Sequence, residues 1–225
     1  MTTDWKLKTI LNEECLSYVL YNESSREALL VDPKKEEQKA YQKIISELAG
    51  YRLLAVIDTH THADHISCAA NMAEKLNAPL IMHERAPSRR VHLRVGKNFE
   101  MPTVAGPMKV LQTPGHTADG LCVLWGPYLF TGDTILYGDT GRDDLPTGDP
   151  AAHFESLELI KKNVSLQTLV LPGHDNKGGR ISTWEEQLRV NPSLTQDRET
   201  FIREASAFVG KPPAQFKESL FENFK

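Results

Sequence analysis

The feature that most constrains this chain is a histidine-rich string at positions 59–67, which reads Thr-His-Thr-His-Ala-Asp-His-Ile-Ser and follows an apolar run at 53–57. Imidazole and carboxylate are ligands that zinc, iron and manganese favour. Without a metal, such groups at the end of a buried strand would be partly desolvated and would repel one another when charged. The string therefore predicts a metal site, and solvated loop histidines are the less favoured alternative. Its candidate ligands are His60, His62, Asp64 and His65.

Three later segments repeat this order of an apolar strand followed by a potential ligand. The expected strands at 109–112, 128–130 and 169–171 run into turns that contain Gly-His, Gly-Asp and Gly-His. Convergent strand ends aim side chains from a rigid scaffold at one point. We therefore expect the four strand ends to build one site. The later segments contribute His116, Asp133 and His174.

The rest of the chain alternates strand and helix patterns, which indicates a mixed α/β protein. The stretch 83–97 breaks all periodicity and carries five basic residues against the single acid Glu84. It predicts a solvated surface loop, with a lid that attracts an anionic substrate as the alternative. Cys68 and Cys122 lie in apolar stretches and are expected in the core. Further expected strands span 16–21, 27–31, 53–57 and 79–82, and expected helices span 38–48 and 69–76.

Composition excludes several classes of partner and location. A net charge of −4 gives no case for nucleic acid or membrane partners, and no apolar run approaches the roughly 20 residues of a membrane span. Three cysteines without a Cys-x-x-Cys pair argue for a reducing compartment. We expect a cytoplasmic protein with one domain, 1–225, in which 176–225 is a short C-terminal helical extension. The aromatic residues of that extension cover the core or form the face of a homodimer, and both alternatives stay open.

The ligand motifs resemble those of the metallo-β-lactamase superfamily in kind, order and approximate spacing, over most of the chain. The motifs are the 60–65 string, Gly115-His116, Gly132-Asp133 and Gly173-His174. This resemblance implies an αββα sandwich, in which two mixed β-sheets are flanked by helices and the metal site lies at one edge.

Two subgroups of that superfamily look similar, the persulfide dioxygenases and the glyoxalase II thioesterases. The tail after His174 looks short for the helical domain of glyoxalase II. The segments 172–175, 182–186 and 191–194, and the tail around Phe201 and Pro212-Pro213, resemble the persulfide dioxygenases. Gly141-Arg142-Asp143-Asp144 also resembles their glycine-arginine-threonine-aspartate stretch. The resemblance therefore favours the dioxygenases.

Carried onto this chain, the dioxygenase pattern implies one Fe(II) per chain, held by His60, His116 and Asp133. This enzyme would use O₂ to oxidise a thiol persulfide, with glutathione persulfide as the expected substrate, to sulfite and free thiol. Arg142 would grip a glutathione carboxylate, and an ion pair with a neighbouring acid is the alternative. Four residues would orient the ligands and shape the pocket, namely His62, Asp64, His65 and His174.

The glyoxalase II pattern implies a different use of the same residues, namely two zinc ions or a mixed zinc, iron and manganese pair that hydrolyses a glutathione thioester or related ester. One metal would bind His60, His62 and His116, the other would bind Asp64, His65 and His174, and Asp133 would bridge them. The chain departs from the dioxygenase pattern at 139–146 and at Asn176, which leaves the thiol carrier open. A non-catalytic electron carrier is disfavoured because the string keeps all three histidines.

Overall fold

Two six-stranded β-sheets form the centre of the protein in a computed structural model that describes residues 4–97, 99–175 and 181–225. In spatial order, the first sheet contains β1 (Trp5–Asn12), β2 (Cys15–Asn22), β3 (Glu27–Val31), β4 (Arg52–Ile57), β5 (Leu80–His83) and β6 (Leu93–Val95). The second contains β12 (Ser182–Thr183), β11 (Leu169–Pro172), β10 (Tyr128–Gly132), β9 (Leu121–Trp125), β8 (Met108–Gln112) and β7 (Phe99–Met101). Both sheets are mixed, since β3, β4, β5 and β6 pair in parallel, as do β10 and β11.

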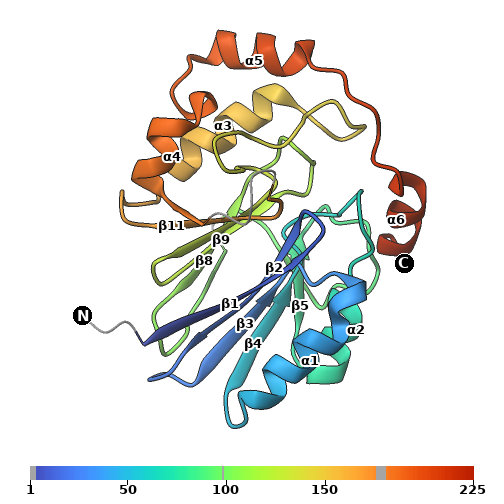
Figure 1. Ribbon diagram of the computed structural model, residues 1–225, viewed down its shortest axis with the longest axis vertical. Coiled ribbons are helices and arrows are strands. Elements are labelled where there is room, and N and C mark those ends of the chain that lie inside the picture. Colours follow the sequence, from blue (N-terminus) through green and yellow to red (C-terminus); the bar gives the residue numbers. More distant parts are fainter. Residues whose placement is uncertain (1–3, 98, 176–180) are drawn as a thin grey trace.

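Helices cover the outer face of each sheet (Figure 1). α1 (Gln38–Glu47) and α2 (Ala69–Leu76) lie on the first sheet, where Tyr41 and Met72 are fully buried against its strands. α3 (Pro150–Lys161), α4 (Trp184–Val190) and α5 (Arg198–Ala207) lie on the second. α6 (Phe216–Asn223) stands apart from both helical layers and reaches the end of the molecule where the strands of the first sheet turn into loops. This arrangement confirms the predicted αββα sandwich.

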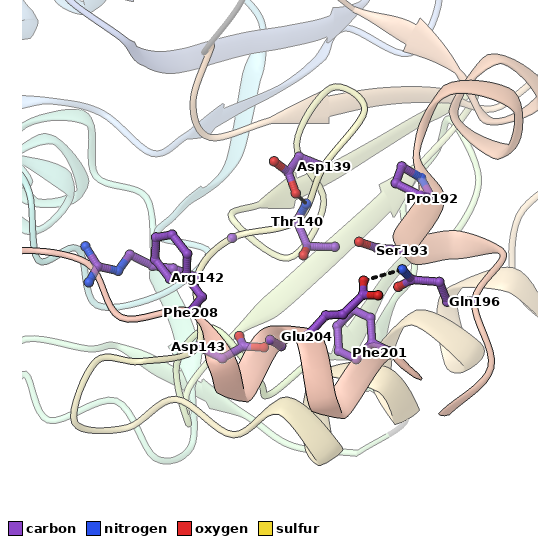
Figure 2. A pocket seen from close by; sticks show the side chains of 12 residues that line it. Asp139, Thr140, Arg142, Asp143, Pro192, Ser193, Gln196, Phe201, Glu204 and Phe208 are labelled. Carbon is purple, nitrogen blue, oxygen red and sulfur yellow. Dashed lines mark hydrogen bonds between the residues drawn. The ribbon is translucent and has the colours of Figure 1, made fainter. Parts of the chain in front are cut away.

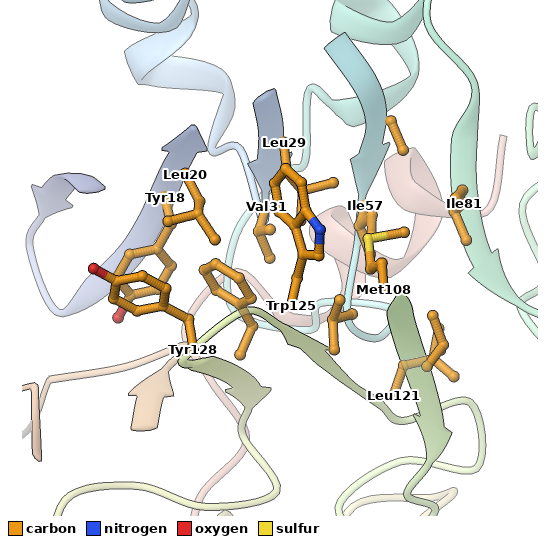
Figure 3. Packing of buried hydrophobic residues seen from close by; sticks show 14 of the residues in the cluster. Tyr18, Leu20, Leu29, Val31, Ile57, Ile81, Met108, Leu121, Trp125 and Tyr128 are labelled. Carbon is orange, nitrogen blue, oxygen red and sulfur yellow. The ribbon is translucent and has the colours of Figure 1, made fainter. Parts of the chain in front are cut away.

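The main hydrophobic core lies between the two sheets (Figure 3). Leu29, Val31 and Ile57 from the first sheet meet Trp125 and Tyr128 from the second. These positions come from strands that are buried on both faces, as expected when helices cover the outside of a sheet. Cys68 and Cys122 are also buried, at 1% and 0% exposure, which confirms their prediction as core residues.

The expected strands and helices are present, each within a few residues of its predicted bounds, and several further elements add to them. The stretch 83–97 is not loop throughout, because β6 pairs in parallel with β5; three residues are too few to show a strand period in the sequence. Strands β1, β7, β9 and β12 and helix α3 were also not predicted. The C-terminal segment contains α4, α5 and α6, while Asn176 lies outside the described residues. Among the helices of the described ranges, none is long and apolar enough to cross a membrane.

Glu27 ties the two sheets together at the end opposite the predicted ligands. Its side chain is 1% exposed, pairs with Arg52, and accepts hydrogen bonds from the backbone N–H groups of Val104 and Ala105 at 3.1 and 3.0 Å. Burial alone would raise the pKa of Glu27, but these hydrogen bonds outweigh burial and lower it below the ordinary value of 4.5. The ionised carboxylate therefore stabilises the contact between β3 and the turn before β8.

Replacing Glu27 by Ala is expected to lower the free energy of unfolding at pH 7 by about 1–3 kcal/mol, because the backbone N–H groups of Val104 and Ala105 lose their charged acceptor. Denaturant unfolding measures this. Since folding lowers the pKa of Glu27, its contribution is complete above the unfolded value near 4.5 and is lost as pH falls through the folded value. The control Glu23→Ala removes an exposed ion pair with Lys6 and is expected to cost less than about 1 kcal/mol. Equal losses in the two variants would contradict the prediction.

Candidate metal centre

The four predicted strand ends converge at one edge of the sandwich. β4 leads into the 58–68 loop, β8 into the loop with His116, β10 into Asp133 and β11 into His174. Within the described part of the chain, three groups of side chains have ligand atoms that all lie within 4.8 Å of one another. They are His60, His116 and Asp133; Cys15, Asp64, His65 and His174; and Asp32, Asp58 and His62. All seven residues predicted around the metal thus lie in these neighbouring groups.

The first group presents two ring nitrogens to one carboxylate oxygen. His116 Nε2 lies 3.6 Å and His60 Nε2 lies 4.0 Å from Asp133 Oδ2. Two donors that bind one metal ion at about 2.1 Å stand roughly 3–4 Å apart, so this spacing suits a shared ion. His60 is 3% exposed and Asp133 is 9% exposed. The donor set therefore fits a metal held in a largely buried position.

The hydrogen bonds on the far side of each ring determine which nitrogen is free. His116 Nδ1 lies 2.6 Å from the backbone oxygen of Arg142, which can only accept, so Nδ1 carries the proton. Thr59 Oγ1 donates to Asp32 Oδ2 at 2.9 Å and can therefore accept from His60 Nδ1 at 3.1 Å. Both rings thus direct an unprotonated Nε2 at the shared point, as metal-binding histidines do.

Local charges keep these groups in the protonation states that a metal requires. Burial, reinforced by the neighbouring charge of His62, lowers the pKa of His60 to about 3. Burial opposes ionisation of Asp133, but the charges of His174, His116 and His60 together with the His174 hydrogen bond hold the Asp133 pKa well below its usual range. At neutral pH His60 is neutral and Asp133 is ionised, which are the forms that coordinate metals.

The second group is a hydrogen-bonded cluster centred on Asp64. Its Oδ2 lies 2.9 Å from both His174 Nε2 and His65 Nδ1, and 3.3 Å from the sulfur of Cys15, which donates to it. His174 Nδ1 in turn lies 2.7 Å from Asp133 Oδ1. Burial would lower the pKa of His174, but Asp133 and Asp64, one on each side of the ring, raise it well above its ordinary value. A protonated His174 therefore joins the two groups.

His62 belongs to the third group, with Asp32 and Asp58. Its Nε2 lies 3.3 Å from Asp32 Oδ1, and its ring lies between those of His60 and His65, with centroid distances of 4.3 and 4.2 Å. Neither ring nitrogen of this buried side chain forms a hydrogen bond within the described residues. Because burial favours the neutral acid, the pKa of the neighbouring Asp58 rises to about 6. His62 thus packs beside the first group but turns away from the point shared by His60, His116 and Asp133.

Two glycines allow the loops to pack this closely. Gly132 has a φ of +49°, and a Cβ there would lie 2.4 Å from Thr59 Oγ1, the hydroxyl that orients His60. At Gly141 a Cβ would lie 2.2 Å from the backbone oxygen of Asp133 and 2.9 Å from His116 Nδ1. Side chains at either position would displace a ligand or its support.

Arg142, the predicted substrate anchor, is engaged within the protein. Its guanidinium forms a bidentate pair with Asp144 at 2.5 and 2.6 Å, and donates to the backbone oxygen of Lys211 at 2.6 Å. Figure 2 shows Arg142 beside Phe208 at one side of a cavity of about 320 Å³ between the 139–143 segment and α5. This pair is the alternative role expected for Arg142 from its acidic neighbours in sequence. The backbone oxygen of Arg142 accepts a hydrogen bond from His116 Nδ1.

Sequence reasoning missed three residues that support the site. Cys15 begins β2 and lies far from the ligands in sequence, so no spacing connects it to them. Thr59 precedes the first histidine, yet its role depends on Asp32, which reaches it from the loop after β3. The third residue, Asn223, comes from α6. A long-range contact of this kind leaves no local pattern in the sequence.

Asn223 holds the backbone of the histidine-rich loop. Its Nδ2 donates to the backbone oxygens of His62 and His65, both at 2.9 Å, and its Oδ1 accepts from the N–H of Ser67 at 2.9 Å. One side chain thus satisfies three backbone groups in a loop without regular hydrogen bonding. We call this set of contacts the Asn223 clamp.

Replacing Asn223 by Ala is expected to weaken metal retention about tenfold or more, because the loop that carries His60 loses its fixed geometry. Titration of the loaded protein with a chelator, followed by elemental analysis, measures retention. The control Glu222→Ala removes an exposed pair with Lys225 on the same helix and is expected to leave retention unchanged. Unchanged retention in a folded Asn223→Ala variant would refute the role of the clamp.

Comparison with known proteins agrees with this geometry. The crystal structure of ETHE1 from Myxococcus xanthus, at 29% identity, has a TM-score of 0.89 and covers 97% of this chain and 98% of that chain. The mitochondrial persulfide dioxygenase ETHE1 of Mus musculus is 31% identical over 191 residues, which cover 83% of this chain and 74% of the relative.

A second relative carries a different activity in its name. The probable polyketide biosynthesis zinc-dependent hydrolase PksB of Bacillus subtilis (strain 168) is 32% identical over 162 residues, which cover 70% of this chain and 71% of the relative. The family model of the metallo-beta-lactamase superfamily matches residues 12–98 and 92–174, which include all seven predicted metal-site residues. With this match, the αββα sandwich and the converging strand ends, the chain belongs to the metallo-β-lactamase superfamily.

Proposed function

We propose that the protein is an iron(II)-dependent persulfide dioxygenase. The observation that carries this proposal is the first group, in which His60 Nε2, His116 Nε2 and Asp133 Oδ2 meet while His62 turns toward Asp32. Two histidines and one carboxylate on one face of a metal are the ligand set of non-haem iron oxygenases. In the proposed reaction, a thiol persulfide, O₂ and water yield the free thiol, sulfite and two protons. The outer sulfur loses four electrons and O₂ gains four.

The protein's residues supply position and charge for this reaction. Bound iron(II) would provide open positions where the substrate sulfur and O₂ meet and exchange electrons. Asp133 would offer Oδ2 to a metal, because its Oδ1 is already bonded to His174 Nδ1 at 2.7 Å. His174 and His65, each bonded to Asp64, have raised pKa values despite burial, because the neighbouring acids favour their charged forms. Their positive charge favours an anionic persulfide beside the metal.

The relatives support this proposal, because the mouse relative is named a persulfide dioxygenase and the Myxococcus xanthus protein carries the same ETHE1 name. The cytoplasmic location and the homodimer stay predictions; the mouse relative is named mitochondrial. Iron as the metal and glutathione persulfide as the substrate are likewise parts of the proposal.

A dinuclear metal hydrolase is the second candidate, and one observation favours it. Cys15, Asp64, His65 and His174 bring four ligand atoms within 4.8 Å of one another, enough to hold a second ion such as zinc. The relative PksB is named a zinc-dependent hydrolase. Against this candidate, a bridging role for Asp133 would require its Oδ1 to leave His174 Nδ1.

Metal stoichiometry separates the two candidates. Protein purified without chelator is expected to contain about one iron per chain and to consume O₂ when glutathione persulfide is added. His60→Ala is expected to lose the iron, whereas Asp64→Ala is expected to keep it, because Asp64 contacts only the neighbours of the ligands. Elemental analysis and an oxygen electrode measure both. About two metals per chain, reduced to one in Asp64→Ala, with no O₂ uptake and with turnover of a glutathione thioester, would instead establish the hydrolase.

A second pair of variants tests Arg142 as an anchor for a glutathione carboxylate. Arg142→Ala is expected to raise KM for glutathione persulfide about tenfold with little change in kcat. The lost contact would hold a carboxylate of the substrate that lies far from the reacting sulfur. Asp144→Asn frees the guanidinium and is expected to leave KM unchanged or lower it. Equal increases of KM in both variants would assign the pair a structural role only.

A further inference from the structure

His153 is a buried histidine outside the three groups of the candidate metal centre. It belongs to α3 and is 0% exposed. Its Nε2 lies 2.8 Å from the backbone oxygen of Thr134, which can only accept, so Nε2 donates. Its Nδ1 lies 2.7 Å from Asp143 Oδ1, and both side chains of this pair are closed to solvent. Each ring nitrogen of His153 thus has a partner in the loop between β10 and α3.

The first partner, Thr134, directly follows the predicted ligand Asp133. Its N–H donates to the backbone oxygen of Thr131 at 3.0 Å, and its hydroxyl donates to Thr113 Oγ1 at 3.2 Å. The bond from His153 fixes the carbonyl group of the same residue. Thr134 is therefore held at its N–H, its hydroxyl and its carbonyl, and this fixes the backbone from which Asp133 projects.

The second partner, Asp143, follows Arg142, whose backbone oxygen accepts from His116 Nδ1 at 2.6 Å. In the same segment, the N–H of Gly141 donates to the backbone oxygen of Asp133 at 2.8 Å. This short segment thus contacts two predicted ligands on one side and the buried ring on α3 on the other. The Asp143 side chain therefore anchors to α3 the backbone that supports His116.

The turn before His116 also packs directly on α3. A Cβ at Gly115 would lie 2.3 Å from His153 Cβ, so only a glycine lets the turn reach the helix this closely. The N–H of Asp149, the N-cap residue of α3, donates to the backbone oxygen of Gly115 at 2.8 Å. The helix that carries His153 thus contacts the backbone beside His116 as well as the backbone beside Asp133.

Phe201 from α5 packs on the ring of His153. It is 3% exposed, and the two rings meet edge to face with centroids 5.7 Å apart. Because the whole contact is buried, solvent does not replace a hydrogen bond lost there. Without His153, the carbonyl of Thr134 and the carboxylate of Asp143 would lose their partner and draw the attached backbone toward other donors.

We infer that His153 is a positioning residue of the metal centre. Its two partners hold the backbone that carries Asp133 and the backbone that supports His116. His153 therefore sets the 3.6 Å distance between His116 Nε2 and Asp133 Oδ2. The third predicted ligand, His60, is oriented by Thr59 instead. This inference rests on the proposed function only in placing the metal at these three ligand side chains.

Cobalt(II) binding tests the inference, because the visible absorption bands of bound cobalt(II) depend on the geometry of its donors. Metal-free protein would be titrated with cobalt(II) under anaerobic conditions. In the double variant His153→Leu/Asp143→Val, apolar side chains replace the whole buried pair, so no unpaired carboxylate remains to unfold the protein. Its affinity for cobalt(II) is expected to fall about tenfold, with shifted bands, because two of the three donors lose their fixed spacing.

Two further variants separate the hydrogen bonds of His153 from the rest of the helix. Asp143→Asn keeps the contact, since its amide can donate to His153 Nδ1, and is expected to bind cobalt(II) within about twofold of the parent and with parental bands. Glu155→Ala removes an exposed pair with Arg198 on the same helix and is expected to change neither the affinity nor the bands.

The bands distinguish positioning from general stability, and denaturant unfolding of the metal-free proteins shows which variants are folded. Shifted bands in a folded double variant, restored to parental in Asp143→Asn, support the inference. Parental bands in the folded double variant would overturn it, whatever its affinity. If the double variant does not fold, the same criteria apply to His153→Gln, whose amide keeps a donor for Thr134 and loses the bond to Asp143.

The cobalt(II) readout keeps this inference separate from the proposed function, since it requires no reaction with O₂. If the bands depend on His153 but iron-loaded parent protein consumes no O₂ with glutathione persulfide, the dioxygenase proposal fails and the positioning role stands. If the parent consumes O₂ but the bands are indifferent to His153, the positioning role fails and the dioxygenase proposal stands.

Discussion

The candidate metal centre depends on how the two oxygens of one buried carboxylate are shared among its neighbours. Asp133 turns Oδ2 toward His60 and His116 and gives Oδ1 to His174. A carboxylate at 9% exposure is unfavourable without compensating charge, and here the protonated ring of His174 provides that charge at Oδ1 while Oδ2 is left for a metal ion. Removing His174 would leave one oxygen free to rotate toward a metal as a second donor. The hydrogen bond between His174 and Asp133 therefore determines how many oxygen donors Asp133 offers to a metal.

The sandwich fold brings four chain segments to one edge, which places the partners of both Asp133 oxygens around that side chain. β4 and β10 lie in different sheets, yet their ends place His60 and Asp133 within reach of one another. Buried strands on both sides of the core provide a rigid base, so small turns after each strand can position side chains accurately. Gly132 and Gly141 then remove the steric bulk that would separate these turns. The candidate ligands come from loops, but the strand ends determine where the loops meet.

Much of this site could be predicted from sequence because its ligands follow strands directly. Apolar runs ending in histidine or aspartate indicate both the element and the residue that it presents, and all seven predicted residues lie at the converging edge. The supporting contacts follow no such rule. Cys15 and Asn223 reach the site across long stretches of sequence, and Arg142 acts on His116 through a backbone oxygen, which any residue type would supply. β6 was missed because three residues show no periodicity, and the role of Arg142 depends on its pairing with Asp144.

The Asn223 clamp can form only after the histidine-rich loop has long been synthesised. Asn223 follows His62 by 161 residues and Ser67 by 156, so the loop that carries His60 is synthesised long before the side chain that holds it. At 5–20 residues per second this interval lasts roughly 10–30 s, to which passage through the ribosomal tunnel adds. During that time the three imidazoles are present on the nascent chain in an unclamped loop. We therefore expect the geometry of this loop to become fixed only after α6 has been synthesised, and any ion captured earlier must survive or be exchanged when the helix docks.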